Sequence, residues 1–283
     1  AFSNTLLSNE YSIDFGDGTI IDATTASHTY DNVGVYNVCV TANNTCISET
    51  VCHNVIIELN VSTFIKAIGD EVNNTIYDAK ITANNNIVAV GTTITSNGDK
   101  NAYVALYDIE GNIIWTQDYG ESQEEEAYAV ELVSDGSFIF VGYSDSYIAS
   151  TDTIISKDVL ATRIDANGNV IWSKIYGDRG IKNPNTDRVD IAKTIHKTTD
   201  GNYLIGGLSY GFGSTDYANY NTVYILKIDE NGSEVWAKSY PRGYTHEHIY
   251  SIKETTNGNI IALGYANGHT QQTGHYRNWL FMK

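Results

Sequence analysis

The sequence predicts an all-β protein: a small N-terminal β-sandwich followed by a larger region of repeated four-stranded sheets. Two observations support this. Apolar residues alternate with polar ones in short runs such as 86–91 and 202–207, and these runs end at glycine or Asn-Gly turns, as strands do. A glycine-to-tryptophan motif then recurs along the second part of the chain. Residues 121–132 contain good helix formers, but the aligned segments of the other repeats are a loop followed by a strand, so we expect no helix there.

Composition limits the classes of partner. The 283 residues include 17 Lys and Arg against 34 Asp and Glu, a formal net charge of −17. An acidic surface without a basic cluster repels phosphates, so nucleic-acid binding is disfavoured. No apolar run approaches the ~20 residues that cross a bilayer, so no transmembrane segment is predicted. The chain begins at Ala1 without a leader, and we expect it to be part of a larger multidomain protein.

The first element is a module over residues 1–57. Its motifs are Tyr-Ser-Ile-Asp-Phe-Gly-Asp-Gly at 11–18, His-Thr-Tyr at 28–30 and Gly-Val-Tyr-Asn-Val-Cys-Val at 34–40. Gly16 and Gly18 permit the positive φ of a tight turn, and Tyr36, Val38 and Val40 are expected to alternate inward. This spacing resembles the PKD domain, an immunoglobulin-like β-sandwich. Family members have more strand before the turn, so the resemblance implies a module truncated at its start.

All three cysteines, Cys39, Cys46 and Cys52, lie in this module. Their clustering favours a structural disulfide, and therefore an extracellular or cell-surface location, over a metal site. With a hairpin turn near residues 44–45, Cys39 and Cys52 face one another, and we predict that pair. Cys46 lies near the turn and is the alternative partner for Cys52.

Beyond residue 58 the chain repeats itself. Trp115, Trp172 and Trp236 end equivalent motifs that are 57 and 64 residues apart. A second anchor is a glycine that follows an Asn- or Asp-rich turn, and its four copies are Gly91, Gly142, Gly207 and Gly264.

Each repeat holds four strands, in the first one over 76–83, 86–93, 102–108 and 112–119. Four antiparallel strands per repeat of about 50 residues are typical of a β-propeller blade. Residues 58–283 are therefore predicted to form a propeller with repeats at 70–119, 120–176, 177–240 and 241–283. The repeats resemble Asp-x-Asn-Gly-x-x-x-Trp blades of secreted and surface proteins of bacteria, often found beside PKD domains and in type IX secretion cargo of Bacteroidota.

Ring closure is the open question about this propeller. Residues 61–69 resemble an outer strand, and the chain ends after a third-type strand at 279–283. Pairing of these two segments would complete the last blade and close a four-blade ring. A larger ring that continues beyond residue 283 is the alternative.

Long connections gather on one face of the ring, because the hairpins on the other face are short. Variable loops on a rigid scaffold commonly carry function, so this long-loop face is the predicted binding surface. Its candidate residues are aromatic or histidine side chains. They are Tyr210, Phe212, Tyr217, Tyr220, Tyr244, His246 and His248.

Metal binding is the weaker interpretation of two patterns. Asp108, Asp165 and Asp229 precede Asn-Gly-type turns that could hold Ca²⁺, but a hairpin requires the same residues and a complete calcium loop is missing. His246 and His248, with His269 and His275, could supply ligands only if their loops converge. We therefore predict no cofactor. An acidic run, Glu121 and Glu124 to Glu126, is expected to be a solvated loop.

No catalytic motif emerges, since the chain has neither a GxSxG elbow nor a phosphate-binding loop. The leading hypothesis is a non-enzymatic secreted or cell-surface module for binding, adhesion or display, whose partner is a protein or a neutral glycan. The alternatives are a glycan-binding or glycan-degrading propeller, and a structural segment of a surface filament or secretion complex.

Overall fold

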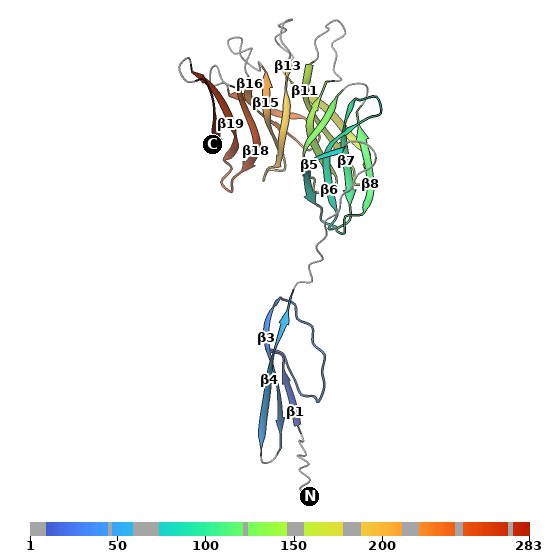
Figure 1. The fold of residues 1–283 in the computed structure, drawn as a ribbon, viewed down its shortest axis with the longest axis vertical. Coiled ribbons are helices and arrows are strands. Elements are labelled where there is room, and N and C mark those ends of the chain that lie inside the picture. Colours follow the sequence, from blue (N-terminus) through green and yellow to red (C-terminus); the bar gives the residue numbers. More distant parts are fainter. Residues whose placement is uncertain are drawn as a thin grey trace. The chain divides into compact units, whose positions relative to one another are not determined.

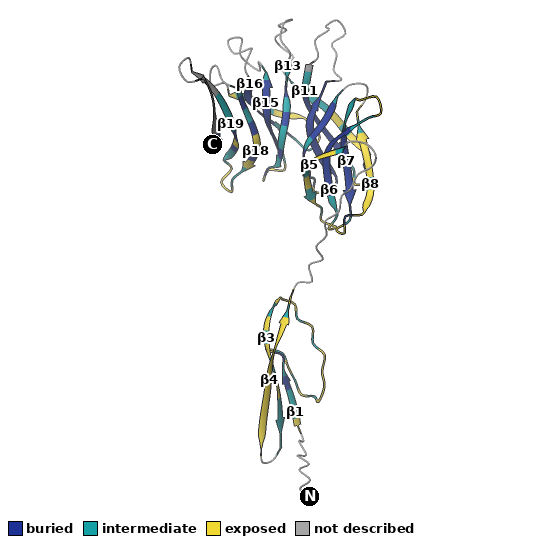
Figure 2. Cartoon of the chain, viewed as in Figure 1, coloured by how far each residue is buried: buried dark blue, intermediate teal, exposed yellow. Residues whose placement is uncertain are grey.

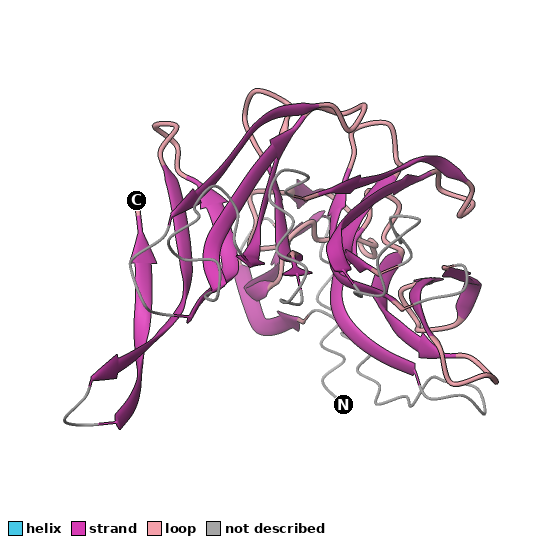
Figure 3. Cartoon of the chain, turned by 90° about the horizontal axis from the view of Figure 1, so that it is seen from above, coloured by secondary structure: helices cyan, strands magenta, loops and turns pink. Residues whose placement is uncertain are grey.

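The computed structural model of the 283-residue chain forms two compact units, Ala1–Ile65 and Lys66–Lys283 (Figure 1). It describes residues 10–44, 47–58, 74–120, 124–145, 156–177, 188–210, 221–240, 246–270 and 274–283. The described residues form strands and no helix, which confirms the all-β prediction (Figure 3). No membrane-spanning helix is therefore found among them.

The first module is one antiparallel sheet in the order β2-β1-β3-β4. The strands are β1 (Glu10–Asp14), β2 (Ile20–Ile21), β3 (Gly34–Asn43) and β4 (Ser48–Ile57). Gly16 and Gly18 have φ values of 77° and 96°, as the turn requires. Val40 is 40% exposed, so the prediction that it points into a core is wrong. No second sheet covers that face among the residues described here.

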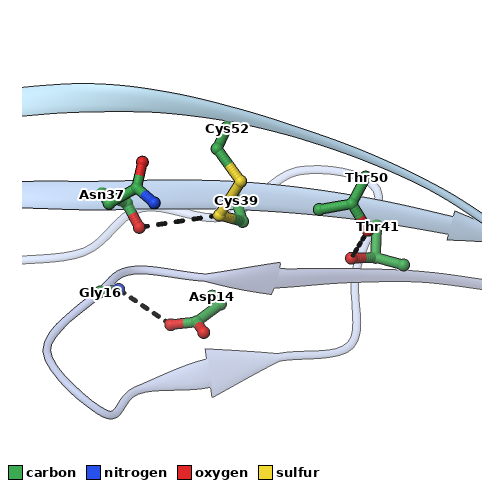
Figure 4. Close-up of a disulfide and its surroundings, with 7 residues drawn as sticks. All are labelled: Asp14, Gly16, Asn37, Cys39, Thr41, Thr50 and Cys52. Carbon is green, nitrogen blue, oxygen red and sulfur yellow. Dashed lines mark hydrogen bonds between the residues drawn. A yellow bond between two sulfur atoms is a disulfide. The ribbon is translucent and has the colours of Figure 1, made fainter.

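Cys39 and Cys52 form the predicted disulfide between β3 and β4 (Figure 4). The two cysteines are direct partners in the antiparallel register, which brings their side chains together. Cys46 lies outside the described residues. A neighbouring cross-strand pair, Thr41 and Thr50, is linked by a 2.8 Å hydrogen bond between hydroxyls. The hairpin is therefore fixed by side chains as well as by its backbone ladder.

The second unit consists of antiparallel sheets whose strands follow one another in chain order, which is the predicted blade pattern. Blade 1 contains β5 (Asn74–Ile81), β6 (Ile87–Ile94), β7 (Lys100–Tyr107) and β8 (Ile113–Tyr119). Blade 2 contains β9 (Glu125–Leu132), β10 (Phe138–Ser144), β11 (Ser156–Ile164) and β12 (Val170–Tyr176). Blade 3 contains β14 (Ile191–Lys197), β15 (Tyr203–Tyr210), β16 (Asn221–Ile228) and β17 (Glu234–Tyr240). Blade 4 contains β18 (His246–Glu254), β19 (Ile260–Thr270) and β20 (Gly274–Met282), and a short strand β13 (Arg188–Val189) pairs in parallel with β11.

These sheets bury apolar side chains between successive blades. The buried residues, dark blue in Figure 2, lie mainly on strands of the second unit. Val90 and Val104 of blade 1 are completely buried and pack in one cluster with Phe140 of blade 2. Blades 2 and 3, and blades 3 and 4, share equivalent clusters. The segment 61–69 falls outside the described residues, so its pairing with β20 stays a prediction.

Two of the repeated tryptophans donate a hydrogen bond to the following blade. The indole nitrogen of Trp115 donates to the carbonyl of Ala166 at 3.0 Å, and that of Trp172 donates to Glu230 at 3.1 Å. Both acceptors lie in the hairpin between the third and fourth strands of the following blade. The three tryptophans have equivalent registers on the fourth strands β8, β12 and β17, as their repeated motif predicted. Their half-buried side chains act at blade interfaces.

Candidate binding site at the bulges of the inner strands

The first strand of every blade contains a β-bulge opposite the repeated glycine. In blade 2, Gly142 pairs with Ala127 while Val141 pairs with Ala129, so Tyr128 has no partner in the register. A Cβ on Gly142 would lie 1.7 Å from the carbonyl oxygen of Glu126, so only glycine fits there. Gly91, Gly207 and Gly264 face the same obstacle, at 1.7–1.9 Å. The bulge geometry thus explains the glycine anchor.

Each bulge leaves one residue out of the ladder, and bulges redirect such side chains. The four bulge residues are Tyr77, Tyr128, Lys193 and Tyr250. Three of the four inner strands therefore carry tyrosine at this position, and blade 3 carries lysine.

The bulge residues of blades 1 to 3 meet. The rings of Tyr77 and Tyr128 have centroids 4.9 Å apart, and Tyr143 lies 6.1 Å beyond Tyr128. The Lys193 ammonium lies 3.2 Å from the centre of the Tyr128 ring, and the Lys157 ammonium lies 4.0 Å from that of Tyr143. Both contacts are cation–π interactions. Side chains from three blades thus form one aromatic and cationic surface.

Two carboxylates complete this surface. Glu126 accepts from the Lys100 ammonium at 2.7 Å, and Glu124 accepts from Lys157 at 2.9 Å. The Tyr143 hydroxyl donates to Glu126 at 3.0 Å and contacts Glu124 at 3.2 Å. We call the whole set the Tyr–Lys–Glu cluster. Its members are Tyr77, Lys100, Glu124, Glu126, Tyr128, Tyr143, Lys157 and Lys193.

The cluster is stabilised in a charged form. Burial would raise the pKa of Glu126, but hydrogen bonds from Lys100, Tyr128 and Tyr143 outweigh it and hold that pKa below its usual value. The hydrogen bond from Lys157 lowers the pKa of Glu124 despite partial burial. The hydrogen bond to Glu126 raises the pKa of Lys100. Glu124, Glu126 and Lys100 are therefore charged at neutral pH.

The remaining groups respond mainly to burial. Burial, and then the nearby carboxylate of Glu126, raise the pKa values of Tyr128 and Tyr143, so both hydroxyls stay protonated. Burial also lowers the pKa of Lys193 to about 8; attraction by Glu126 opposes this shift and repulsion by Lys157 adds to it. The cluster offers hydroxyl donors, carboxylate acceptors and ammonium groups on an aromatic base.

The cluster corrects one sequence expectation. Glu125 and Glu126 are 5% and 4% exposed and begin strand β9, so this part of the acidic run is not a solvated loop. The reason is long-range pairing: Glu126 meets Lys100 of blade 1, and Ser144 donates to Glu125 at 2.9 Å. Glu121 lies outside the described residues.

The structure describes three of the seven residues predicted for the long-loop face, Tyr210, His246 and His248. Phe212, Tyr217, Tyr220 and Tyr244 lie outside the described residues, and their role stays a prediction. Tyr210 ends β15, and its backbone amide donates to Asp190 at 3.3 Å.

His246 and His248 lie on β18. His248 has the register on β18 that Glu126 has on β9, and His246 stands two residues before it, as Glu124 does before Glu126. The His248 ring stacks on Tyr265 with centroids 4.7 Å apart, and Asn221 of blade 3 contacts both histidines. The structure therefore places these histidines at the level of the cluster, on the fourth blade.

The sequence analysis missed the cluster itself. Its signal was present, because the bulge residue stands at a fixed position relative to the glycine anchor in all four repeats. Without the register, nothing showed that this position leaves the ladder or that Tyr77 and Tyr128 lie together.

Among the side chains that the structure describes, no group of three or more His, Cys, Asp or Glu residues is placed to hold a metal ion. The turn aspartates serve their hairpins: Asp108 accepts from the Asn112 amide at 2.7 Å and Asp229 from the Ser233 amide at 2.7 Å.

Comparison with known proteins identifies the first module. Residues 3–58 match the model of the PKD domain family. A PKD domain with a disulfide is typical of an extracellular protein. No curated protein matches the chain in sequence.

Solved structures give only distant similarities. Sqt1 from Chaetomium thermophilum is 9% identical with a TM-score of 0.36, over 70% of this chain and 44% of that one. The NanB sialidase from Streptococcus pneumoniae is 13% identical with a TM-score of 0.41, over 90% and 38%. An N-acetylgalactosamine deacetylase from F. plautii is 9% identical with a TM-score of 0.41, over 86% and 83%. The chain thus spans less than half the length of the first two proteins.

Proposed function

We propose that this chain is a non-enzymatic extracellular binding module, and that the Tyr–Lys–Glu cluster binds a glycan. The observation that carries the proposal is the convergence of bulge residues from three blades on one surface with two ion pairs. Aromatic rings offer rigid faces on which sugar rings pack, and carboxylate and ammonium groups exchange hydrogen bonds with sugar hydroxyls.

Part of the cluster is accessible to a ligand. Tyr77 is 47% exposed as a residue, and the side chains of Lys100 and Glu124 are 38% and 39% exposed. Tyr143 is 2% exposed, and its hydroxyl contacts both carboxylates and holds them in place. A buried support beneath exposed contact groups is the arrangement that preorganised sites require.

A glycan array probed with the full chain tests this proposal. We expect binding to at least one glycan, and a loss of at least about tenfold in affinity for Tyr77→Ala, because that variant removes the exposed aromatic ring. Tyr240→Ala is the matched control, since Tyr240 is 37% exposed on the outer strand β17. Absence of any glycan binding, or equal binding by Tyr77→Ala and the wild type, would contradict the proposal.

The other predicted functions, a display platform and a segment of a surface filament or secretion complex, do not depend on this cluster. A protein partner at the long-loop face is the competing ligand class. Pull-down of a protein by the wild type and by Tyr77→Ala alike, without glycan binding, would favour it.

A further inference from the structure

We propose that the ligand of the Tyr–Lys–Glu cluster carries a carboxylate, and that the ammonium group of Lys193 binds it. This inference rests on the proposed function and names the ligand class: a glycan with a single acidic sugar. It departs from the neutral glycan that the overall charge favours, because it follows from the local charges.

The first argument is the position of Lys193. The same bulge position holds tyrosine in blades 1, 2 and 4, so the fold does not require a lysine there. Lysine at this place adds a positive charge beside the Tyr128 ring, 3.2 Å from its centre. The substitution changes the chemistry of the surface while keeping the bulge.

The second argument is charge balance. The other two lysines of the cluster each have a carboxylate partner, at 2.7 and 2.9 Å. Among the residues that the structure describes, no carboxylate lies within ion-pair distance of the Lys193 ammonium. The nearby charges oppose one another, since Glu126 favours the charged lysine and Lys157 disfavours it. A partly buried ammonium group that has no carboxylate at ion-pair distance in the described part of the chain gains more from a ligand carboxylate than the paired Lys100 and Lys157 do.

The third argument limits the ligand to few charges. The chain carries a net charge of −17, so a polyanion would be repelled at long range. One carboxylate on a sugar satisfies Lys193, while its neutral ring packs on tyrosine and its hydroxyls meet Glu124 and Lys100.

The test compares two disaccharides that differ by one carboxylate, cellobiose and cellobiouronic acid, by isothermal titration of the full chain. We expect cellobiouronic acid to bind at least about tenfold more tightly. Lys193→Tyr, which introduces the residue of the other three blades, should abolish the preference, whereas Lys193→Arg should keep it. Lys238→Met is the control, because the Lys238 ammonium also lies near an aromatic ring, 5.5 Å from the centre of Trp236 on the outer strand.

A failure of this inference and a failure of the proposed function give different experimental results. Equal binding of both sugars, with loss in Tyr77→Ala, would overturn this inference and leave the proposed function intact. An unchanged preference in Lys193→Tyr would also overturn it. A peptide with a free terminal carboxylate that binds as well as cellobiouronic acid would overturn the assignment to a sugar. No binding of any glycan would contradict the proposed function as well.

Discussion

The first module and the propeller are both built from antiparallel strands, but they are stabilised differently. In the first module, Ile13 and Phe15 are the buried apolar residues among those described, and Val51 and Ile56 of β4 are 54% and 63% exposed. A disulfide joins β3 and β4 there. In the propeller, each sheet is packed against the next, so that both faces of the central blades are buried. The disulfide therefore lies in the unit that buries few apolar side chains.

The largest expected effect is in the propeller. Gly142→Ala places a Cβ 1.7 Å from a backbone carbonyl, so the bulge must break, and we expect a loss of about 4 kcal/mol or more in the free energy of unfolding. Gly136→Ala is the control, because that glycine has a positive φ but open space around it. Its cost should be about 1–2 kcal/mol. Denaturant unfolding measures both, and equal losses would refute the bulge explanation.

The disulfide is expected to matter only for the first module. Replacing Cys39 and Cys52 together by Ala should cost that module about 2–4 kcal/mol through greater freedom of its unfolded chain. Calorimetry of the full chain should show one transition moving and the propeller transition unchanged. A shift of the propeller transition would mean that the two units unfold together.

Removing a tyrosine hydroxyl from each unit compares the two units through a smaller expected change in stability. The buried Tyr176 hydroxyl donates to Gly232 of the next blade at 2.6 Å, so Tyr176→Phe should cost about 1–3 kcal/mol by leaving the acceptor without its donor. In the first module, the Tyr36 hydroxyl donates to Asn32 at an exposed site. Tyr36→Phe should change stability by no more than about 0.5 kcal/mol. Equal effects would show that the hydrogen bond from Tyr176 to the next blade contributes little to the free energy of unfolding.

The last effect concerns pH. The pKa of Lys193 is about 8 in the folded chain against an ordinary 10.5, so the folded chain binds fewer protons between these values than the unfolded chain. Raising the pH through that window therefore stabilises the propeller. Lys193→Met should lack this gain. Unfolding of both proteins at about pH 7.5 and 9.5 checks the sign, and a relative loss in the wild type would contradict it.

The sequence predicted the parts of the fold that depend on local pattern. Turn glycines, alternating strands and the tryptophan repeat identified the blades, and facing positions in a hairpin identified the Cys39–Cys52 bond. The Tyr–Lys–Glu cluster was not predicted, because Lys100 and Glu126 pair across two blades and Lys193 reaches Tyr128 from a third. Such contacts depend on register and on the bulge, and neither is visible in spacing alone. The same long-range pairing explains why the acidic run was misjudged.

The most direct test of the central claim, that the bulges of the propeller build the binding site, is calorimetry of the full chain with increasing cellobiouronic acid. A ligand that binds only the folded propeller must raise its transition temperature as its concentration rises. We predict that the propeller transition rises, that the transition of the first module stays fixed, and that Lys193→Tyr removes the rise. A rise in the first module's transition, or an equal rise in Lys193→Tyr, would contradict the claim.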